Sequence, residues 1–217
     1  MPYPNVLIVG SSGSGKTRSI KNLNPDDVLI INQEQKQLPF REAKNFKNNF
    51  FVETYSNVLE TLQFKVKPEH KIVVIESLQS ISDQLLKESR TLNKGYDIFN
   101  WHNIRINDLL GTIKKMTEKI VVVLDLDDLY DEKNPDGSSK SYRCARVNGR
   151  EKRAEIERDF EIVLFTDVMK NPDGSMNYRF LTNTDGICTA KSPEGMFQRW
   201  IPNDLKVVVD GINNYYK

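Results

Sequence analysis

Short runs of aliphatic residues alternate with stretches of mixed polarity along the first half of the chain. The runs cover residues 6–9, 28–31, 71–75 and 119–124. Uninterrupted apolar runs of this length are typical of parallel strands buried on both faces. Residues 78–90 and 98–117, by contrast, carry apolar side chains at helical spacing. Strands that alternate with helices indicate an α/β fold, with a mostly parallel central sheet flanked by helices.

The pattern changes after residue 126. Residues 127–141 are mostly polar, and the sequence Asn-Pro-Asp-Gly at 134–137 predicts an exposed loop or turn. Asn-Gly at 148–149 then separates residues 142–147 from 151–156, which predicts a tight antiparallel hairpin. The second arm has an alternative interpretation, a helical turn over 151–158.

A second hairpin is predicted further along the chain. Its arms are residues 160–169 and 176–182, on either side of a second Asn-Pro-Asp-Gly sequence. In the tail, residues 203–216 have apolar positions at helical spacing, and Asn203 or Asp204 can cap that helix. The C-terminal half is therefore expected to add antiparallel hairpin strands and a final helix.

The first predicted strand leads directly into a glycine-rich sequence that matches the P-loop pattern. The motif consists of Gly10, Ser11, Ser12, Gly13, Ser14, Gly15, Lys16 and Thr17. Glycines let successive backbone N–H groups turn toward a phosphate, and a helix expected over 18–23 adds its positive N-terminal end. The Lys16 ammonium is expected to reach the β- and γ-phosphates, and the Thr17 hydroxyl to bind Mg²⁺. The motif predicts ATP and Mg²⁺ as ligands.

Three acidic residues lie where the predicted strands end. Glu34 follows the second strand, Glu76 ends the third and Asp125 ends the fourth. Because ligands of such folds bind at the carboxyl ends of the strands, these carboxylates are candidates for holding Mg²⁺ and orienting an attacking water. The alternative for each is a solvated carboxylate at a strand end.

Composition narrows the class of protein further. With 217 residues, of which 38% are hydrophobic, a single domain with a packed core is expected. We divide it into a nucleotide-binding core (1–126), a loop and hairpin elaboration (127–183) and a C-terminal segment with a helix (184–217). The sequence has no long apolar run, no secretory signal and only two cysteines. We therefore expect a cytoplasmic protein that does not bind a membrane.

Charge is nearly balanced over the whole chain. Lys and Arg total 31 and Asp and Glu total 30, a net charge of +1, which argues against a globally basic nucleic-acid binder. Residues 140–150, however, contain no acid. The candidates there for contacts with single-stranded DNA are Lys140, Tyr142, Arg143, Arg146 and Arg150.

The same basic residues have two other interpretations. The stretch could be a solvated hairpin, or one of Arg143, Arg146 and Lys191 could reach the nucleotide of a neighbouring subunit as an arginine-finger type of contact.

Over nearly its whole length the sequence resembles the phage nucleotide-binding proteins of the P-loop superfamily, which include single-strand-annealing ATPases. The resemblance covers the P-loop, residues 30–40, 72–77 and 95–97, and a C-terminal block over 182–205 that is the most family-specific part. It implies a RecA-like core. It also implies an ATPase of phage DNA recombination, single-strand annealing or replication that is slow and stimulated by DNA.

The resemblance also assigns roles to residues. Glu34 matches the glutamate that orients the attacking water, and Glu76 matches the Walker B position, which usually holds an aspartate. Asp125 lies where relatives carry a polar sensor that ends in Ser-His, and this chain has no histidine there. A ring or filament of identical subunits, with a single-strand-binding protein as a further partner, is implied as well.

Two other functions stay open at this level. A small-molecule kinase that phosphorylates nucleosides or nucleotides would use the same loop with arginines on a lid, although no acceptor pocket can be identified. A nucleotide-responsive binding module with little turnover would be consistent with Glu76 and the missing histidine. A GTPase is disfavoured, because no Asn-Lys-X-Asp motif is present.

Overall fold

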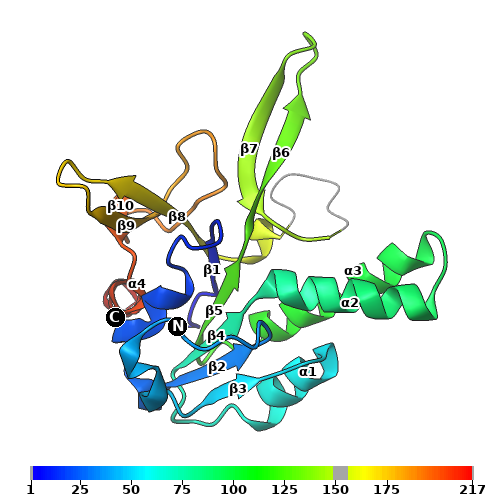
Figure 1. The fold of residues 1–217 in the computed structure, drawn as a ribbon, viewed down its shortest axis with the longest axis horizontal. Coiled ribbons are helices and arrows are strands. Elements are labelled where there is room, and N and C mark those ends of the chain that lie inside the picture. The colour runs from blue at the N-terminus through cyan, green and yellow to red at the C-terminus, as the bar shows by residue number, and fades with distance from the viewer. Residues whose placement is uncertain (1, 149–155, 217) are drawn as a thin grey trace.

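The computed structural model describes residues 2–148 and 156–216, which form one eight-stranded sheet and a separate two-stranded sheet. The large sheet has the order β10-β9-β8-β1-β5-β4-β2-β3 (Figure 1). Its strands are β1 (Val6–Val9), β2 (Val28–Asn32), β3 (Asn49–Phe51), β4 (Ile72–Glu76), β5 (Ile120–Asp125), β8 (Ile162–Lys170), β9 (Met176–Leu181) and β10 (Trp200–Pro202). From β8 to β3 all neighbours are parallel, whereas β9 and β10 pair antiparallel at one edge. The α/β prediction and its four strands are confirmed.

The helices cover both faces of this sheet. They are α1 (Tyr55–Phe64), α2 (Leu78–Leu92), α3 (Asp97–Lys114) and α4 (Leu205–Tyr215). Short 3-10 helices are η1 (Thr17–Asn22), η2 (Pro25–Asp27), η3 (Arg41–Asn45) and η4 (Glu157–Asp159). The helices predicted over 78–90, 98–117 and the tail are confirmed. The helix expected over 18–23 is instead the 3-10 helix η1, while α1, β3 and β10 were not predicted.

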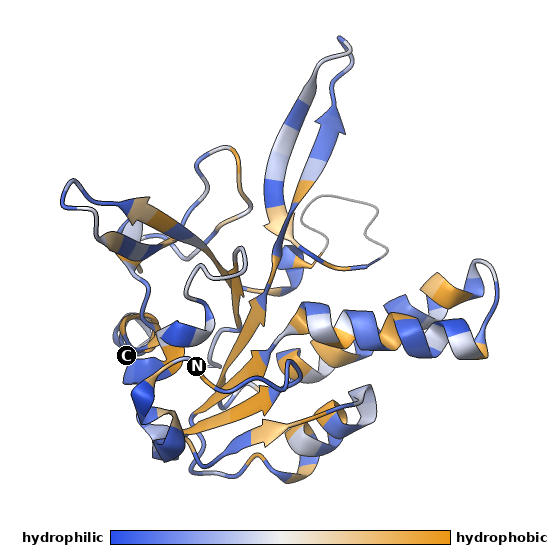
Figure 2. Ribbon diagram, viewed as in Figure 1, coloured by the Kyte–Doolittle hydropathy of each residue, from blue (hydrophilic) through white to orange (hydrophobic). Residues whose placement is uncertain are grey.

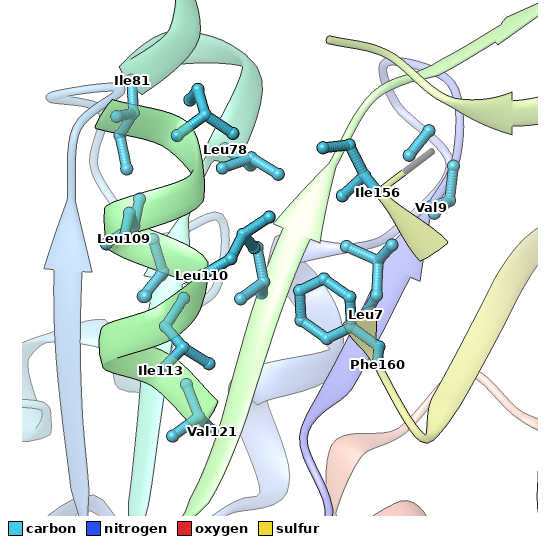
Figure 3. Packing of buried hydrophobic residues seen from close by; sticks show 14 of the residues in the cluster. Leu7, Val9, Leu78, Ile81, Leu109, Leu110, Ile113, Val121, Ile156 and Phe160 are labelled. Atoms are coloured by element: carbon cyan, nitrogen blue, oxygen red, sulfur yellow. The ribbon is translucent and has the colours of Figure 1, made fainter. Parts of the chain in front are cut away.

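Alternation along the buried strands divides the core into two layers. In β1, Leu7 and Val9 face α1–α3, whereas Val6 and Ile8 face η1 and α4. Side chains on a strand point alternately to opposite faces, so a strand covered on both sides must be apolar throughout. Figure 3 shows the first layer, where Leu7 and Phe160 pack near the α3 residues Leu109, Leu110 and Ile113. Burial on both faces explains why apolar and polar residues do not alternate in the runs from which these strands were predicted.

The second sheet is a hairpin of β6 (Asp127–Lys133) and β7 (Ser139–Ala145), which extends away from the large sheet (Figure 1). Most of its surface is hydrophilic, as Figure 2 shows. The exposed turn predicted at 134–137 is confirmed, but the strands on either side of it were not predicted. The Asn-Pro-Asp-Gly sequence at 134–137 closes this hairpin, with Gly137 N donating to Asn134 O at 3.0 Å.

The predicted pairing of 142–147 with 151–156 stays a prediction, because most of its second arm lies outside the described residues. Residues 142–145 are strand, and they pair with β6, which was not predicted. Residues 149–155 lie outside the described residues, and the chain next shows η4, a 3-10 helix. In the register of β6 and β7, Glu132 lies opposite Lys140 and Tyr130 opposite Tyr142, and such cross-strand pairs favour this pairing.

The second predicted hairpin is confirmed as β8 and β9. The sequence pattern missed that β8 also pairs in parallel with β1, with Val9 opposite Phe165. The strand is therefore part of the central sheet as well as of the hairpin. Among the described residues no helix is long and apolar enough to cross a membrane.

We predict that the cap of α4 contributes measurably to stability. The Asp204 carboxylate accepts from Lys206 N at 2.9 Å and from Asn22 Nδ2 at 2.7 Å, so it both caps the helix and ties it to η1. Asp204→Ala should lower the free energy of unfolding in urea by about 1 kcal/mol. The control is Asp210→Ala on the same helix, whose exposed pair with Lys206 contributes less than about 0.5 kcal/mol. Equal losses in the two variants would contradict the prediction.

Candidate nucleotide-binding site

The carboxyl ends of β1, β5, β4 and β2 meet at one edge of the sheet, and the glycine-rich loop lies there. Strand register places Val9 opposite Asp125, and Asn32 opposite Glu76. A cavity of about 410 Å³ opens beside the loop. Residues from the loop, the segment after β2, the end of β4 and β9 line it, among them Gly13, Lys16, Thr17, Glu34, Glu76 and Tyr178.

Close contacts within the loop explain its glycines. A Cβ on Gly10 would lie 1.6 Å from Thr166 Oγ1, and Gly13 and Gly15 have φ angles of +78° and +92°. Only glycine accommodates the first position, and glycine is favoured at the other two. The predicted need for glycine at these positions is therefore matched by both packing and backbone conformation.

The Lys16 ammonium lies folded over the loop. Its Nζ donates to the carbonyl oxygens of Gly10 at 2.6 Å and Ser11 at 3.0 Å, and the residue is 8% exposed. Burial lowers the pKa of Lys16, although the nearby carboxylates, first of all Glu76, partly oppose the shift. Lys16 is thus a buried cation held where a phosphate chain would enter.

Thr17 and Glu76 lie in direct contact. Thr17 Oγ1 donates to Glu76 Oε1 at 2.7 Å, while Glu76 Oε2 is buried and has no hydrogen-bond partner among the described residues. Burial raises the pKa of Glu76 to about 7, and the hydrogen bond from Thr17 only partly offsets this. An oxygen pair with one unpartnered carboxylate atom suits a hard divalent cation such as Mg²⁺. The structure therefore brings together the two residues predicted to hold the metal.

Glu34 lies beside this pair. The backbone N–H groups of Gln33 and Glu34 both donate to the carbonyl oxygen of Glu76, at 2.6 and 3.3 Å, which fixes the segment after β2. Glu34 Oε1 accepts from Ser77 Oγ at 3.2 Å, and Glu34 Oε2 pairs with Lys36 Nζ at 2.7 Å. The carboxylate faces the cavity but is held by an exposed lysine.

Asp125 is placed differently from the other two carboxylates. It is fully buried and does not line the cavity. Its Oδ1 accepts from Gln79 N in the first turn of α2 at 2.8 Å, and burial raises its pKa well above the ordinary value. The structure thus gives Asp125 a contact with α2, and its proposed contact with nucleotide stays a prediction.

Several residues at the site were missed by the sequence analysis. Thr166 Oγ1, at the end of the parallel stretch of β8, donates to Ser14 Oγ at 2.8 Å, and Asn203 Nδ2 donates to Ser14 O at 3.1 Å. The Tyr178 ring lines the cavity, with the Arg18 guanidinium 5.6 Å from its centroid. A parallel assignment for residues 162–165 would have pointed to Thr166, whereas nothing local marks Tyr178 or Asn203.

The predicted DNA-contacting residues do not form one face. Lys140 Nζ lies 4.9 Å from the centroid of the Tyr142 ring, on one side of β7. Arg143 lies on the other side and pairs with Asp127, next to the P-loop. Arg146 is exposed beyond the end of β7, and Arg150 lies outside the described residues. Residues 140–145 of the acid-free stretch are also paired with the acidic strand β6.

The parallel sheet, the glycine-rich loop after β1 and the acidic strand ends define a P-loop NTPase with a RecA-like fold. More particularly, the chain belongs to a family of AAA domains, which matches residues 3–195. No curated protein sequence matches the chain. The described residues contain no group of three or more His, Cys, Asp or Glu side chains arranged to hold a metal by themselves.

Solved structures match the chain at low sequence identity. The chain is similar to a KaiC-like protein of the hyperthermophilic archaeon Pyrococcus horikoshii, with 14% identity and a TM-score of 0.52 over 93% of this chain and 85% of that chain. It is also similar to the RadB recombinase, with 14% identity and a TM-score of 0.48 over 83% and 88% of the two chains. It is similar as well to the flagellar accessory protein FlaH of Methanocaldococcus jannaschii, with 11% identity and a TM-score of 0.46 over 93% of this chain and 85% of that chain.

We predict a pH-dependent stability that originates at Glu76. Its pKa is about 7 in the folded chain, against the ordinary value of 4.5 that applies to the unfolded chain. Between these two pH values the folded chain keeps a proton that the unfolded chain has lost. Stability from this group therefore falls as pH rises from about 4.5 to 7 and stays lower above that. Glu76→Gln, which cannot ionise, should exceed the parent in stability by on the order of 3 kcal/mol near pH 8.

The measurement is urea denaturation of the nucleotide-free and metal-free protein at several pH values. The advantage of Glu76→Gln should shrink toward about pH 5, where the parent carboxyl is protonated as well. Glu69→Gln is the control, because the Glu69 side chain is 60% exposed. A difference between Glu76→Gln and parent that does not vary with pH would contradict the assignment.

Proposed function

We propose that the protein is a Mg²⁺-dependent ATP hydrolase that acts in phage DNA recombination, single-strand annealing or replication. The observation that carries the ATPase part is the convergence of Lys16, the Thr17–Glu76 pair and Glu34 around one cavity. A nucleotide-binding loop, a metal-holding pair and a carboxylate beside them are the parts that phosphoryl transfer to water requires.

The P-loop is suited to bind the phosphates of ATP. Lys16 Nζ now contacts two carbonyl oxygens of the loop, and it can exchange these for phosphate oxygens by a small movement. Thr17 Oγ1 and Glu76 would hold Mg²⁺, whose contribution when bound is to neutralise charge that develops on the phosphates. Because Glu76 is half protonated near neutral pH, holding the cation there releases a proton from this carboxyl.

Glu34 is the proposed group that orients and deprotonates the attacking water. Its carboxylate is paired with Lys36 in the nucleotide-free protein, and the Lys36 side chain is 78% exposed. An exposed ion pair of this kind contributes little free energy, so its separation on substrate binding costs little. The pair has to separate before Glu34 can act on water, and the free-energy cost of that separation is small.

The DNA part of the proposal rests on the resemblance to phage single-strand-annealing ATPases and on the Lys140–Tyr142 face of the hairpin. A cation beside a half-buried aromatic ring can follow a phosphate backbone and stack a base on the accessible part of the ring. With a net charge of +1, binding should need several subunits, which agrees with assembly into a ring or filament in the host cytoplasm. A single-strand-binding protein is the proposed further partner.

We predict ATP hydrolysis that rises when single-stranded DNA is added. Phosphate release is measured with the parent protein, with and without DNA, and in parallel with candidate nucleosides as phosphoryl acceptors. Lys16→Ala should abolish turnover, because it removes the ammonium that lies over the loop and is expected to bind the β- and γ-phosphates. A phosphorylated nucleoside would establish the kinase alternative instead, and ATP binding without turnover would favour a binding module.

We also predict that Glu34→Gln separates binding from turnover. The amide keeps the size of the side chain but cannot accept a proton, so hydrolysis should fall by roughly a hundredfold or more while ATP affinity changes little. Lys36→Ala is the matched variant, because it frees the Glu34 carboxylate and should leave turnover equal or higher. Hydrolysis by Glu34→Gln at the parent rate would remove Glu34 from the mechanism.

A further inference from the structure

A polar bridge connects the P-loop to the base of the β6–β7 hairpin. Ser11 Oγ donates to Asp127 Oδ2 at 3.0 Å, and the same oxygen accepts from Arg143 Nη2 at 2.8 Å and Arg143 Nε at 3.2 Å. The hydroxyl and the guanidinium thus meet at a single carboxylate atom. Asp127 is the first residue of β6, so the bridge lies where the hairpin leaves the central sheet.

The Arg143 side chain is fixed against β8. Its guanidinium carbon lies 5.4 Å from the centroid of the Phe165 ring, and Nη2 lies 3.5 Å from Thr166 O. Thr166 in turn donates to Ser14 of the loop. Ser11 therefore contacts Asp127 and Ser14 contacts Thr166, and the Arg143 guanidinium contacts both of these partners.

Arg143 also lines a second cavity of about 410 Å³ on this side of the loop, together with Ser11, Ser12, Gly13 and Ser14. It is the only cationic side chain among the residues that line this cavity. The guanidinium uses Nε and Nη2 on Asp127, whereas Nη1 has no hydrogen-bond partner in the part of the chain that the structure describes. One donor group of Arg143 therefore remains available beside the loop.

Electrostatics favour a phosphate as the partner of this donor. The site holds the carboxylates of Glu34, Glu76 and Asp127 close to Lys16, and each of them repels an incoming polyphosphate. A guanidinium presents five donors in a planar fork and so can bind a carboxylate and a phosphate at once. With 31% of its side chain exposed, Arg143 can be reached by a ligand without leaving its contact with Asp127.

We propose that Arg143 binds the terminal phosphate of a nucleoside triphosphate held by the P-loop of its own chain. It does so through Nη1 while Nε and Nη2 keep their contact with Asp127. This assigns Arg143 to the nucleotide in cis, and not to DNA or to the nucleotide of a neighbouring subunit. The proposal rests on the proposed function, since it requires that the loop bind a triphosphate.

The first experiment measures equilibrium binding of a non-hydrolysable ATP analogue and of ADP by calorimetry. Arg143→Ala should weaken binding of the triphosphate analogue by roughly ten- to a hundredfold, the size of one hydrogen bond to a charged group, and change ADP binding less than about threefold. Lys133→Ala is the matched control, because it removes one positive charge from the far end of the same hairpin. It should leave both affinities at the parent values.

The second experiment separates action in cis from action in trans. Arg143→Ala keeps an intact P-loop, and Lys16→Ala keeps an intact Arg143. If Arg143 acts within its own chain, a mixture of the two variants hydrolyses ATP no faster than the sum of the separate proteins. Recovery of activity in the mixture would overturn the proposal in favour of a contact between subunits.

The outcomes also distinguish this proposal from the one before it. A parent protein that fails to bind the triphosphate analogue would overturn the proposed function. A parent that binds it, together with Arg143→Ala that keeps the parent ratio of triphosphate to diphosphate affinity, would overturn the role of Arg143 alone. Circular dichroism of each variant shows whether it is folded before its affinity is compared.

Discussion

The site depends on burying charge at the ends of apolar strands. Lys16, Glu76 and Asp125 are 8%, 5% and 0% exposed, although transfer of an isolated charge from water into a protein interior is strongly unfavourable. Each group is therefore tied to fixed polar atoms: Lys16 to loop carbonyls, Glu76 to the Thr17 hydroxyl, and Asp125 to a backbone N–H of α2. The positions of the loop, β4 and α2 follow from these contacts.

This arrangement also prepares the site for a nucleotide. Polar groups that are already oriented in a water-poor cavity need little reorganisation when charge develops on a substrate. Lys16 and Glu76 have pKa values shifted in the direction of their neutral forms, the first lowered and the second raised, because burial penalises both charges. A bound polyphosphate would favour the charged form of Lys16, and a divalent cation the charged form of Glu76, which couples ligand binding to the stability of the site.

The sequence predicted the parts of the fold that local pattern determines. The apolar runs ending in Gly10, Glu76 and Asp125 correctly placed the strands and put their ends at one edge, and the P-loop motif located the cavity. Two kinds of feature escaped prediction. The pairing of β6 with β7 depends on residues across the hairpin, and the contacts of Tyr178 and Asn203 join positions more than 150 residues from the loop. Neither leaves a periodic signal near the residues concerned.

Chain continuity gives the hairpin a mechanical link to the nucleotide. β5 ends at Asp125 and β6 begins at Asp127, so only Leu126 separates the central sheet from the hairpin, and Leu126 itself lines the nucleotide cavity. Its carbonyl accepts from Arg146 N at 2.8 Å, which returns the other strand of the hairpin to the same point. The hairpin is therefore joined to the central sheet by a short connection that is hydrogen-bonded at both strands and borders the nucleotide cavity. Because this connection lies at the cavity, it is the point at which a change at the nucleotide would reach a hairpin that carries five acidic and three basic residues over 127–145.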